Sequence, residues 1–231
     1  MLRPAVTACV GVILAARFAS SALPAAPDRQ TPGVTVSIFN VAHVPPRTLA
    51  HAEQVASGIF QAAGIETEWT AALVANPVDL LTDFSVAPAS GCDQPLGSDT
   101  VRVQILTAAP PGFSIQALGY SLPCAGRGIQ VTIYEDRIEA VSEHTLAAFY
   151  RVLGHALAHE IGHVLLQSSA HEKTGIMKSV WSKADWQRAA VTIVPFSSDE
   201  ANRILQQLQQ MRSAGIAIAF QKTPRNVRAA H

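Results

Sequence analysis

The feature that most restricts the fold of this chain is a long apolar segment, residues 146–166, that contains no proline. Its apolar side chains recur with a period close to 3.6 residues, which is typical of a helix with a buried face. The members of this series are Leu146, Phe149, Val152, Leu153, Leu157, Ile161, Val164 and Leu165. The sequence therefore predicts a buried helix from about Ser142 to Gln167.

The same segment contains the run His159-Glu160-Ile161-Gly162-His163. Two histidines at i and i+4 lie on one face of a helix, so they can bind one zinc ion. Glu160 lies one step round the helix, where it can reach a water molecule without being a ligand. A core helix that happens to carry two histidines is the alternative. We favour the metal site, because a buried glutamate between two buried histidines is costly unless it has a function. The pattern indicates metal-assisted hydrolysis of peptide bonds.

Composition and charge limit the other functions. The chain has 231 residues, of which 48% are hydrophobic and 15% charged, with a formal net charge of zero. These values suit one domain, or one domain with two lobes around a cleft. No block of like charges occurs, so nothing indicates a nucleic acid or an anionic membrane surface as a partner. The oligomeric state is left open.

Residues 1–26 have the pattern of a secretory signal peptide: a short charged start, an apolar centre and small residues at the exit. Cleavage after Ala22 or Ala26 would fit this pattern. Arg17 ends the apolar stretch early, and a membrane anchor or a frayed N-terminus is the alternative. Only eight residues precede Cys9, which leaves no room for the apolar region of a lipoprotein signal. We expect an exported protein, secreted or periplasmic.

Cys92 and Cys124 remain after removal of such a signal. Two cysteines in an exported chain most often form a disulfide. Closing a loop of about 30 residues contributes roughly 3–4 kcal/mol in the chain-entropy model. A zinc-binding or latency thiol is the weaker alternative, because neither cysteine lies in a short metal-ligand pair.

The rest of the chain predicts alternating strands and helices. A strand at 34–41, a helix at 46–63 and a strand at 65–70 are typical of a crossover unit between parallel strands. Further strands are expected at 100–106, 117–122 and 128–134, and a surface loop at 72–98. The run Ser197-Ser198-Asp199-Glu200 matches a capping box and predicts the start of a last helix. The polar tail at 222–231 is expected to be disordered.

With this order of elements and the His-Glu-x-x-His helix, the chain resembles the zincin metallopeptidases, and the metzincins in particular. It is also similar to exported bacterial proteins of unassigned activity with a distal histidine and a Gly-Ile-Met sequence. The resemblance implies an α+β fold with a mixed, mostly parallel twisted sheet, a backing helix, a long active-site helix and a small, mainly helical C-terminal lobe. The catalytic domain would span 27–221, with an upper lobe at about 34–167 and a lower lobe at about 168–221.

The resemblance also assigns residues to roles. Zn²⁺ would be bound by His159, His163 and His171, Glu160 would be the catalytic base, and Met177 would occupy a tight turn beneath the metal. Core packing is the simpler explanation of Met177. One departure affects the third ligand, because seven residues, none of them glycine, separate His163 from His171, where the metzincin pattern has five and a glycine.

Other side chains compete for a place in the site. Glu172 and Glu200 are alternatives to His171 as third ligand, although Glu200 is explained by the capping box. His155 lies two turns, or about 12 Å of rise, from His163, so one zinc ion cannot easily use both. We therefore expect His155 to be a hydrogen-bonded core or supporting residue; a second metal is the lesser alternative. Trp181 and Trp186 could line a pocket, although core packing is expected for at least one.

Two other functions stay open at this stage. One is a non-catalytic secreted or envelope protein that zinc merely stabilises, which would need a fourth ligand such as Glu172 or Asp185. The other is the hydrolysis of a non-peptide amide. For a peptidase, the strand at 117–122 is the expected edge along which a peptide substrate would pair.

Overall fold

The computed structural model describes residues 31–72, 100–114, 116–123, 129–143 and 146–222. Several predictions concern other parts of the chain: the signal peptide at 1–26, the pairing of Cys92 with Cys124, most of the loop at 72–98, and the tail beyond residue 222. They lie outside the described residues and stay predictions.

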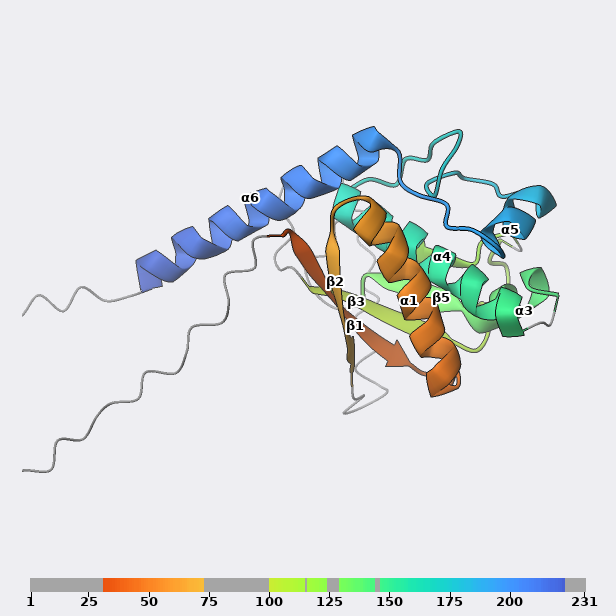
Figure 1. The fold of residues 1–231 in the computed structure, drawn as a ribbon. Coiled ribbons are helices and arrows are strands. Elements are labelled where there is room, and N and C mark those ends of the chain that lie inside the picture. The colour runs from red at the N-terminus through yellow and green to blue at the C-terminus, as the bar shows by residue number, and fades with distance from the viewer. Residues whose placement is uncertain (1–30, 73–99, 115, 124–128, 144–145, 223–231) are drawn as a thin grey trace, which may run out of the picture.

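The described strands form one five-stranded sheet (Figure 1). In spatial order these are β2 (Glu66–Ala71), β1 (Gly33–Asn40), β3 (Thr100–Leu106), β5 (Val131–Tyr134) and β4 (Gly119–Ser121). The first four are parallel, and β4 pairs with β5 in the antiparallel direction at one edge. The mixed, mostly parallel sheet that the sequence predicts is confirmed. The strands at the β4 edge are shorter than expected.

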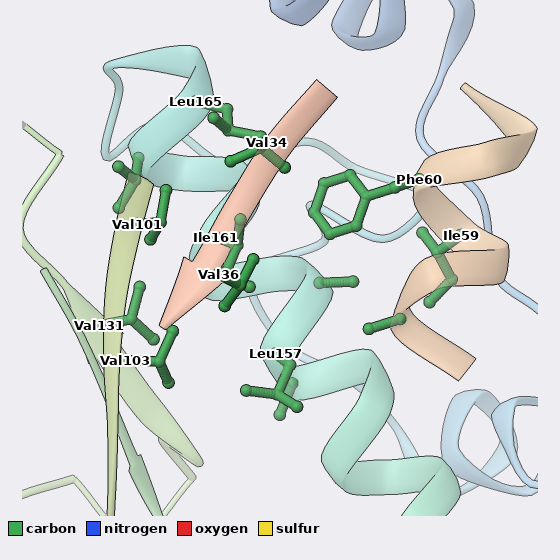
Figure 2. Packing of buried hydrophobic residues seen from close by; sticks show 14 of the residues in the cluster. Val34, Val36, Ile59, Phe60, Val101, Val103, Val131, Leu157, Ile161 and Leu165 are labelled. Atoms are coloured by element: carbon green, nitrogen blue, oxygen red, sulfur yellow. The ribbon is translucent and has the colours of Figure 1, made fainter. Parts of the chain in front are cut away.

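Two helices pack against this sheet and against each other, α1 (Pro46–Ala62) and α4 (Leu146–Leu166). Pro46 is the first residue of α1 and Pro45 is its N-cap, and at these positions a missing N–H group costs nothing. Figure 2 shows buried side chains of β1 and β3, such as Val36 and Val103, in one cluster with Phe60 of α1 and Leu157 and Ile161 of α4. This layer is the main hydrophobic core, and it fixes the helix that carries the histidines.

α1 and α4 approach each other closely at Gly154. A Cβ atom at Gly154 would lie 2.7 Å from the carbonyl oxygen of Ala52 and 2.6 Å from Cβ of Val55. Only glycine allows this separation between the two helices. The backing helix therefore positions α4 through direct backbone contact.

Three further helices are described: α3 (Glu135–Val141), α5 (Lys183–Ala189) and α6 (Ser198–Lys222). α3 is a correction, because the sequence interpretation placed no element between the strand that ends at residue 134 and the long helix that starts near Ser142. α6 begins as predicted: Glu200 accepts the Ser197 N–H at 2.6 Å, and Ser197 Oγ accepts the Glu200 N–H at 3.2 Å. Within the described ranges, no helix is both long and apolar enough to span a membrane.

Candidate metal centre

The structure brings the side chains of His159, His163 and His171 together. Nε2 of His163 lies 3.1 Å from Nε2 of His159 and 3.3 Å from Nε2 of His171. α4 supplies the first two residues, and the loop that follows the helix supplies the third. Their exposure differs, since His163 is buried, His159 half-buried and His171 exposed.

Backbone carbonyl groups orient the two helical rings. His159 Nδ1 lies 2.7 Å from the carbonyl oxygen of Ile176, and His163 Nδ1 lies 2.8 Å from that of Ser168. A carbonyl oxygen only accepts, so each Nδ1 must carry the proton. Burial lowers the pKa of both rings, that of His159 to about 4, and thus favours their neutral forms. Each Nε2 atom is then left with a lone pair and no hydrogen.

This arrangement fits a bound metal ion. The contact between Nε2 of His159 and Nε2 of His163 is not a hydrogen bond, because neither atom has a proton to share. Two tetrahedral zinc–nitrogen bonds of about 2.05 Å place their nitrogen atoms roughly 3.3 Å apart, close to the observed 3.1 and 3.3 Å. Ligating histidines typically donate their other N–H to a carbonyl or carboxylate, as both rings do here. Three histidine nitrogen atoms are the donor set of a zinc site with one open position.

The end of α4 explains how the chain reaches His171 without a glycine. Gln167 adopts a left-handed conformation with φ of 49°. Its N–H bonds to the carbonyl of Val164 at 3.1 Å, and the Ser168 N–H bonds to that of His163 at 3.1 Å. These are the two hydrogen bonds of a Schellman motif, with Gln167 in the position that glycine usually occupies. The same turn places the Ser168 carbonyl against the His163 ring.

The Gly175-Ile176-Met177 sequence forms a turn beneath α4. Gly175 has φ of 77°, and the Ile176 N–H bonds to the carbonyl of Pro195 at 3.1 Å. Met177 is 1% exposed, and its Sδ would lie 2.8 Å from a Cβ atom at Gly162. The turn therefore packs directly under the metal-binding motif and supplies the Ile176 carbonyl that orients His159. Met177 therefore lies both in a turn and in the core.

Glu160 is buried, with 8% of its surface exposed, and it lines the same pocket as the three histidines. Burial raises the pKa of its carboxyl group to about 7, and a hydrogen bond from the Ser121 side chain opposes this shift. Ser121 is the last residue of the edge strand β4. The carboxylate is thus placed between the metal-binding rings and the sheet edge.

The pocket has a volume of about 630 Å³, and α4, β4 and the segment 178–186 contribute most of its lining. Trp181 and Trp186 both line it and are both half-buried. They are therefore walls of the pocket, and neither belongs to the fully buried core.

The competing carboxylates lie elsewhere. Asp185 is bonded to Lys178 and Ser182, Glu200 caps α6, and Glu172 is exposed. Within the part of the chain that the structure describes, no fourth histidine, cysteine or carboxylate joins the three histidines. His155 is buried and hydrogen-bonded: its Nδ1–H donates to the Arg151 carbonyl at 2.7 Å, and its Nε2 accepts the Val194 N–H at 3.2 Å.

Sequence reasoning missed three groups that shape the site. The carbonyl groups of Ser168 and Ile176 have no signature in the sequence, because any residue provides one. Ser121 lies in a strand that was predicted to border the site, but nothing indicated that its hydroxyl would reach Glu160.

Comparison with known proteins adds structural neighbours. No family model matches the chain, and no curated protein matches it in sequence. Among solved structures, it is similar to metalloproteinase-II from Bacteroides fragilis, with 14% identity, a TM-score of 0.45, and coverage of 77% of this chain and 54% of the other. The chain thus spans about half the length of that protein.

Two smaller proteins are also similar, both at 14% identity and a TM-score of 0.41. A zinc-dependent peptidase from Methanocorpusculum labreanum is matched over 75% of this chain and 99% of its own. Archaemetzincin from Methanopyrus kandleri is matched over 79% of this chain and 98% of its own.

Proposed function

We propose that this chain is a zinc-dependent peptidase in which His159, His163 and His171 bind the metal and Glu160 is the general base. The observation that carries the proposal is the convergence of the Nε2 atoms of three histidines beside a buried carboxylate in one pocket. A metal ion used only for structure has no need of that carboxylate. Three protein ligands, the number in the described residues, are the number in catalytic zinc sites.

The roles of the chain's own residues follow from their positions. When bound, zinc supplies Lewis acidity and lowers the pKa of coordinated water toward 7. Glu160 takes a proton from the attacking water and passes it to the amine that leaves. The Ser121 hydroxyl holds the Glu160 carboxylate toward the pocket. The Ile176 and Ser168 carbonyls fix the ring orientation of the two helical histidines.

β4 offers a place for the peptide backbone. All three of its residues line the pocket, and one of its edges pairs with β5. An extended peptide could add to the opposite edge of β4 by backbone hydrogen bonds, as in other cases of strand addition. A substrate held in this way would run past Glu160, because Ser121 connects the strand to that carboxylate.

The test combines metal analysis with digestion of a peptide library, with and without a chelator. The wild-type protein should contain one zinc ion per chain and cleave peptides only without chelator. Glu160→Gln should keep the zinc and lose at least about 100-fold in kcat/KM, which is the lower range for general acid–base catalysis. Glu172→Gln is the matched control, since it removes an exposed carboxylate one residue from His171 and should change neither value.

Each alternative function predicts a different result. A zinc-stabilised binding protein would hold the metal through four protein ligands and cleave nothing. A hydrolase of non-peptide amides would bind zinc through three nitrogen atoms and water but leave the library intact. Unchanged peptide cleavage by Glu160→Gln would remove that residue from the role of base.

A further inference from the structure

His155 is a buried histidine that takes no part in the proposed chemistry. It lies on α4 one turn before His159 and is 1% exposed. Its Nδ1–H donates to the carbonyl of Arg151 at 2.7 Å, so its Nε2 has a lone pair, which accepts the N–H of Val194 at 3.2 Å. Arg151 belongs to the same helix, whereas Val194 lies 39 residues further along the chain. Nε2 is therefore the atom through which this ring holds a distant segment.

That segment, residues 194–196, lies between α4 and the turn beneath the candidate metal centre. The carbonyl of Pro195 accepts the Ile176 N–H at 3.1 Å. The next residue, Phe196, is buried, and its ring would lie 2.8 Å from a Cβ atom at Gly162. The segment thus contacts α4 before and within the metal-binding motif, and it bonds to the turn between these two contacts.

Ile176 completes the connection to the first candidate ligand. Its carbonyl oxygen lies 2.7 Å from Nδ1 of His159, in the hydrogen bond that orients this ring. Its N–H is the group that Pro195 accepts. A shift of Pro195 would therefore move a residue that contacts the ligand directly. Three hydrogen bonds form a closed path that leaves α4 at His155 and returns to it at His159.

The ring of His163 is held locally instead. Its Nδ1–H donates to the carbonyl of Ser168, which lies in the turn that ends α4. The N–H of Ser168 bonds back to the carbonyl of His163 at 3.1 Å. The orientation of His163 therefore depends on the end of its own helix, so this ring is an internal control for any effect that reaches His159 through 194–196.

We propose that His155 is a positioning residue for the candidate zinc ligand His159. Its Nε2 atom holds the segment 194–196, which through Ile176 fixes the orientation of the His159 ring. The inference rests on the proposed function, because it takes His159 as a ligand of zinc. The test therefore includes one measurement that needs no metal and one that needs no hydrolysis.

Two substitutions separate the two nitrogen atoms of the His155 ring. Glutamine places an amide oxygen as far along the side chain as Nε2, so His155→Gln can still accept the Val194 N–H. Asparagine places an amide nitrogen as far along as Nδ1, so His155→Asn keeps the donor to Arg151 and loses the acceptor. If the ring acted only within its own helix, His155→Asn would be the milder change. The proposal predicts the opposite order.

The first measurement uses the zinc-free protein. In its nitrogen-15 spectrum, the ring N–H signals of His159 and His163 are assigned by their loss in His159→Gln and His163→Gln. In His155→Asn, the His159 signal should exchange with water at least about fivefold faster, as expected from the loss of one hydrogen bond of the path. The His163 signal should keep its rate, and in His155→Gln both signals should keep theirs.

The second measurement is zinc affinity, determined by competition with a chelator. His155→Asn should bind zinc about tenfold more weakly than the wild type, at the lower end of the effect of removing an outer partner of a metal ligand, and His155→Gln should stay within about threefold. Val152→Ala is the control, because it truncates a buried side chain of the same helix that lies outside the path. It should lower the stability measured by urea unfolding and leave the zinc affinity of the folded protein unchanged.

The outcomes separate the path from the proposed function. Faster exchange of the His159 signal in His155→Asn, together with a wild-type protein that binds no zinc, would support the path and contradict the metal centre. Unchanged exchange and zinc affinity in a His155→Asn protein that is folded by circular dichroism would overturn the proposal. Equal effects of His155→Asn and His155→Gln, or equal changes of the His159 and His163 signals, would also overturn it. Should His155→Asn fail to fold, His155→Phe keeps a ring without the acceptor, and the same outcomes decide.

Discussion

The two parts of the candidate metal centre are built differently. His159 and His163 lie on α4, are oriented by backbone carbonyls and are partly or fully buried. His171 lies on the loop after the helix, and its side chain is exposed. The helix fixes two ligands before a metal arrives, whereas the loop supplies the third from a segment with few core contacts. The helix therefore provides two rigid candidate ligands, and the loop provides an adjustable one.

The largest effect should come from removing the metal, because zinc connects the loop to the helix. Binding stabilises the folded state by about 4 kcal/mol at a free ligand concentration 1,000 times Kd. A chelator should therefore lower the free energy of unfolding by roughly this amount at such a concentration. Hydrogen exchange would locate the change. The amides of Glu172 and Ile176, which bond to Met177 and Pro195, should then exchange through local opening, whereas the α4 amides should still exchange only through global unfolding. Loop amides that also exchange only through global unfolding would contradict the comparison.

On the helical side, Gly154→Ala should be nearly as damaging. The added methyl group would meet the Ala52 carbonyl and Val55 at 2.6–2.7 Å, and backbone atoms cannot move aside as a side chain can. We expect a loss of about 3 kcal/mol, at the upper end of the usual cost of overpacking, measured by urea unfolding of the zinc-free protein. Gly112→Ala is the control in a loop, where φ is 84° and an added Cβ atom would have no neighbour within 4 Å. If Gly112→Ala lowered the free energy of unfolding as much as Gly154→Ala does, the close contact between α1 and α4 would not be the cause.

Truncating single ligands should separate metal binding from stability. His163→Ala and His171→Ala should both abolish tight zinc binding, since each removes one of three nitrogen donors. In the zinc-free protein, His163→Ala should lower the free energy of unfolding by about 1–3 kcal/mol, because it leaves the Ser168 carbonyl without its donor. His171→Ala, at an exposed position, should change that free energy by no more than about 0.5 kcal/mol. Isothermal titration with zinc and urea unfolding provide the two measurements; equal losses of stability would show that the loop ligand is as preorganised as the helical one.

The smallest effect concerns the turn between the two parts. A left-handed conformation costs a non-glycine residue roughly 1–2 kcal/mol, and glycine loses about 0.5–1 kcal/mol more backbone entropy than alanine on folding. Gln167→Gly should therefore stabilise the protein by about 0.5–1 kcal/mol in urea unfolding, with zinc affinity unchanged. Gln167→Ala keeps the strain and should give no such gain, so a gain of equal size in both variants would argue against the left-handed turn as its source.

The helical half of the site could be predicted from sequence, and the loop half could not. Apolar periodicity and the i, i+4 spacing locate His159 and His163 on one buried face without any tertiary information. The position of His171 depends on Gln167 turning left-handed and on the pairing of Glu172 with Lys178, and neither has a clear local signal. Its assignment came from resemblance, and the geometry then brought the three rings together.

The fold shows the same division. Alternating β-branched residues predicted β1 and β3 closely, because both strands lie in the middle of the sheet and bury one face. α3 was missed, since seven residues with Ile138 as their one buried side chain are too short for a helical period to be evident. β4 was predicted as six residues but has three, because alternation does not show where the pairing with a partner strand ends.

The packing of Met177 under Gly162 has a consequence for oxidative damage. Conversion of a thioether to a sulfoxide adds a polar oxygen atom, and the sulfur of Met177 is buried in a space that would not hold one more methyl group on the helix above it. Peroxide should therefore modify this side chain only in molecules that have already opened. The extent of its oxidation, read by mass spectrometry, would report how often the turn beneath the candidate metal centre separates from α4.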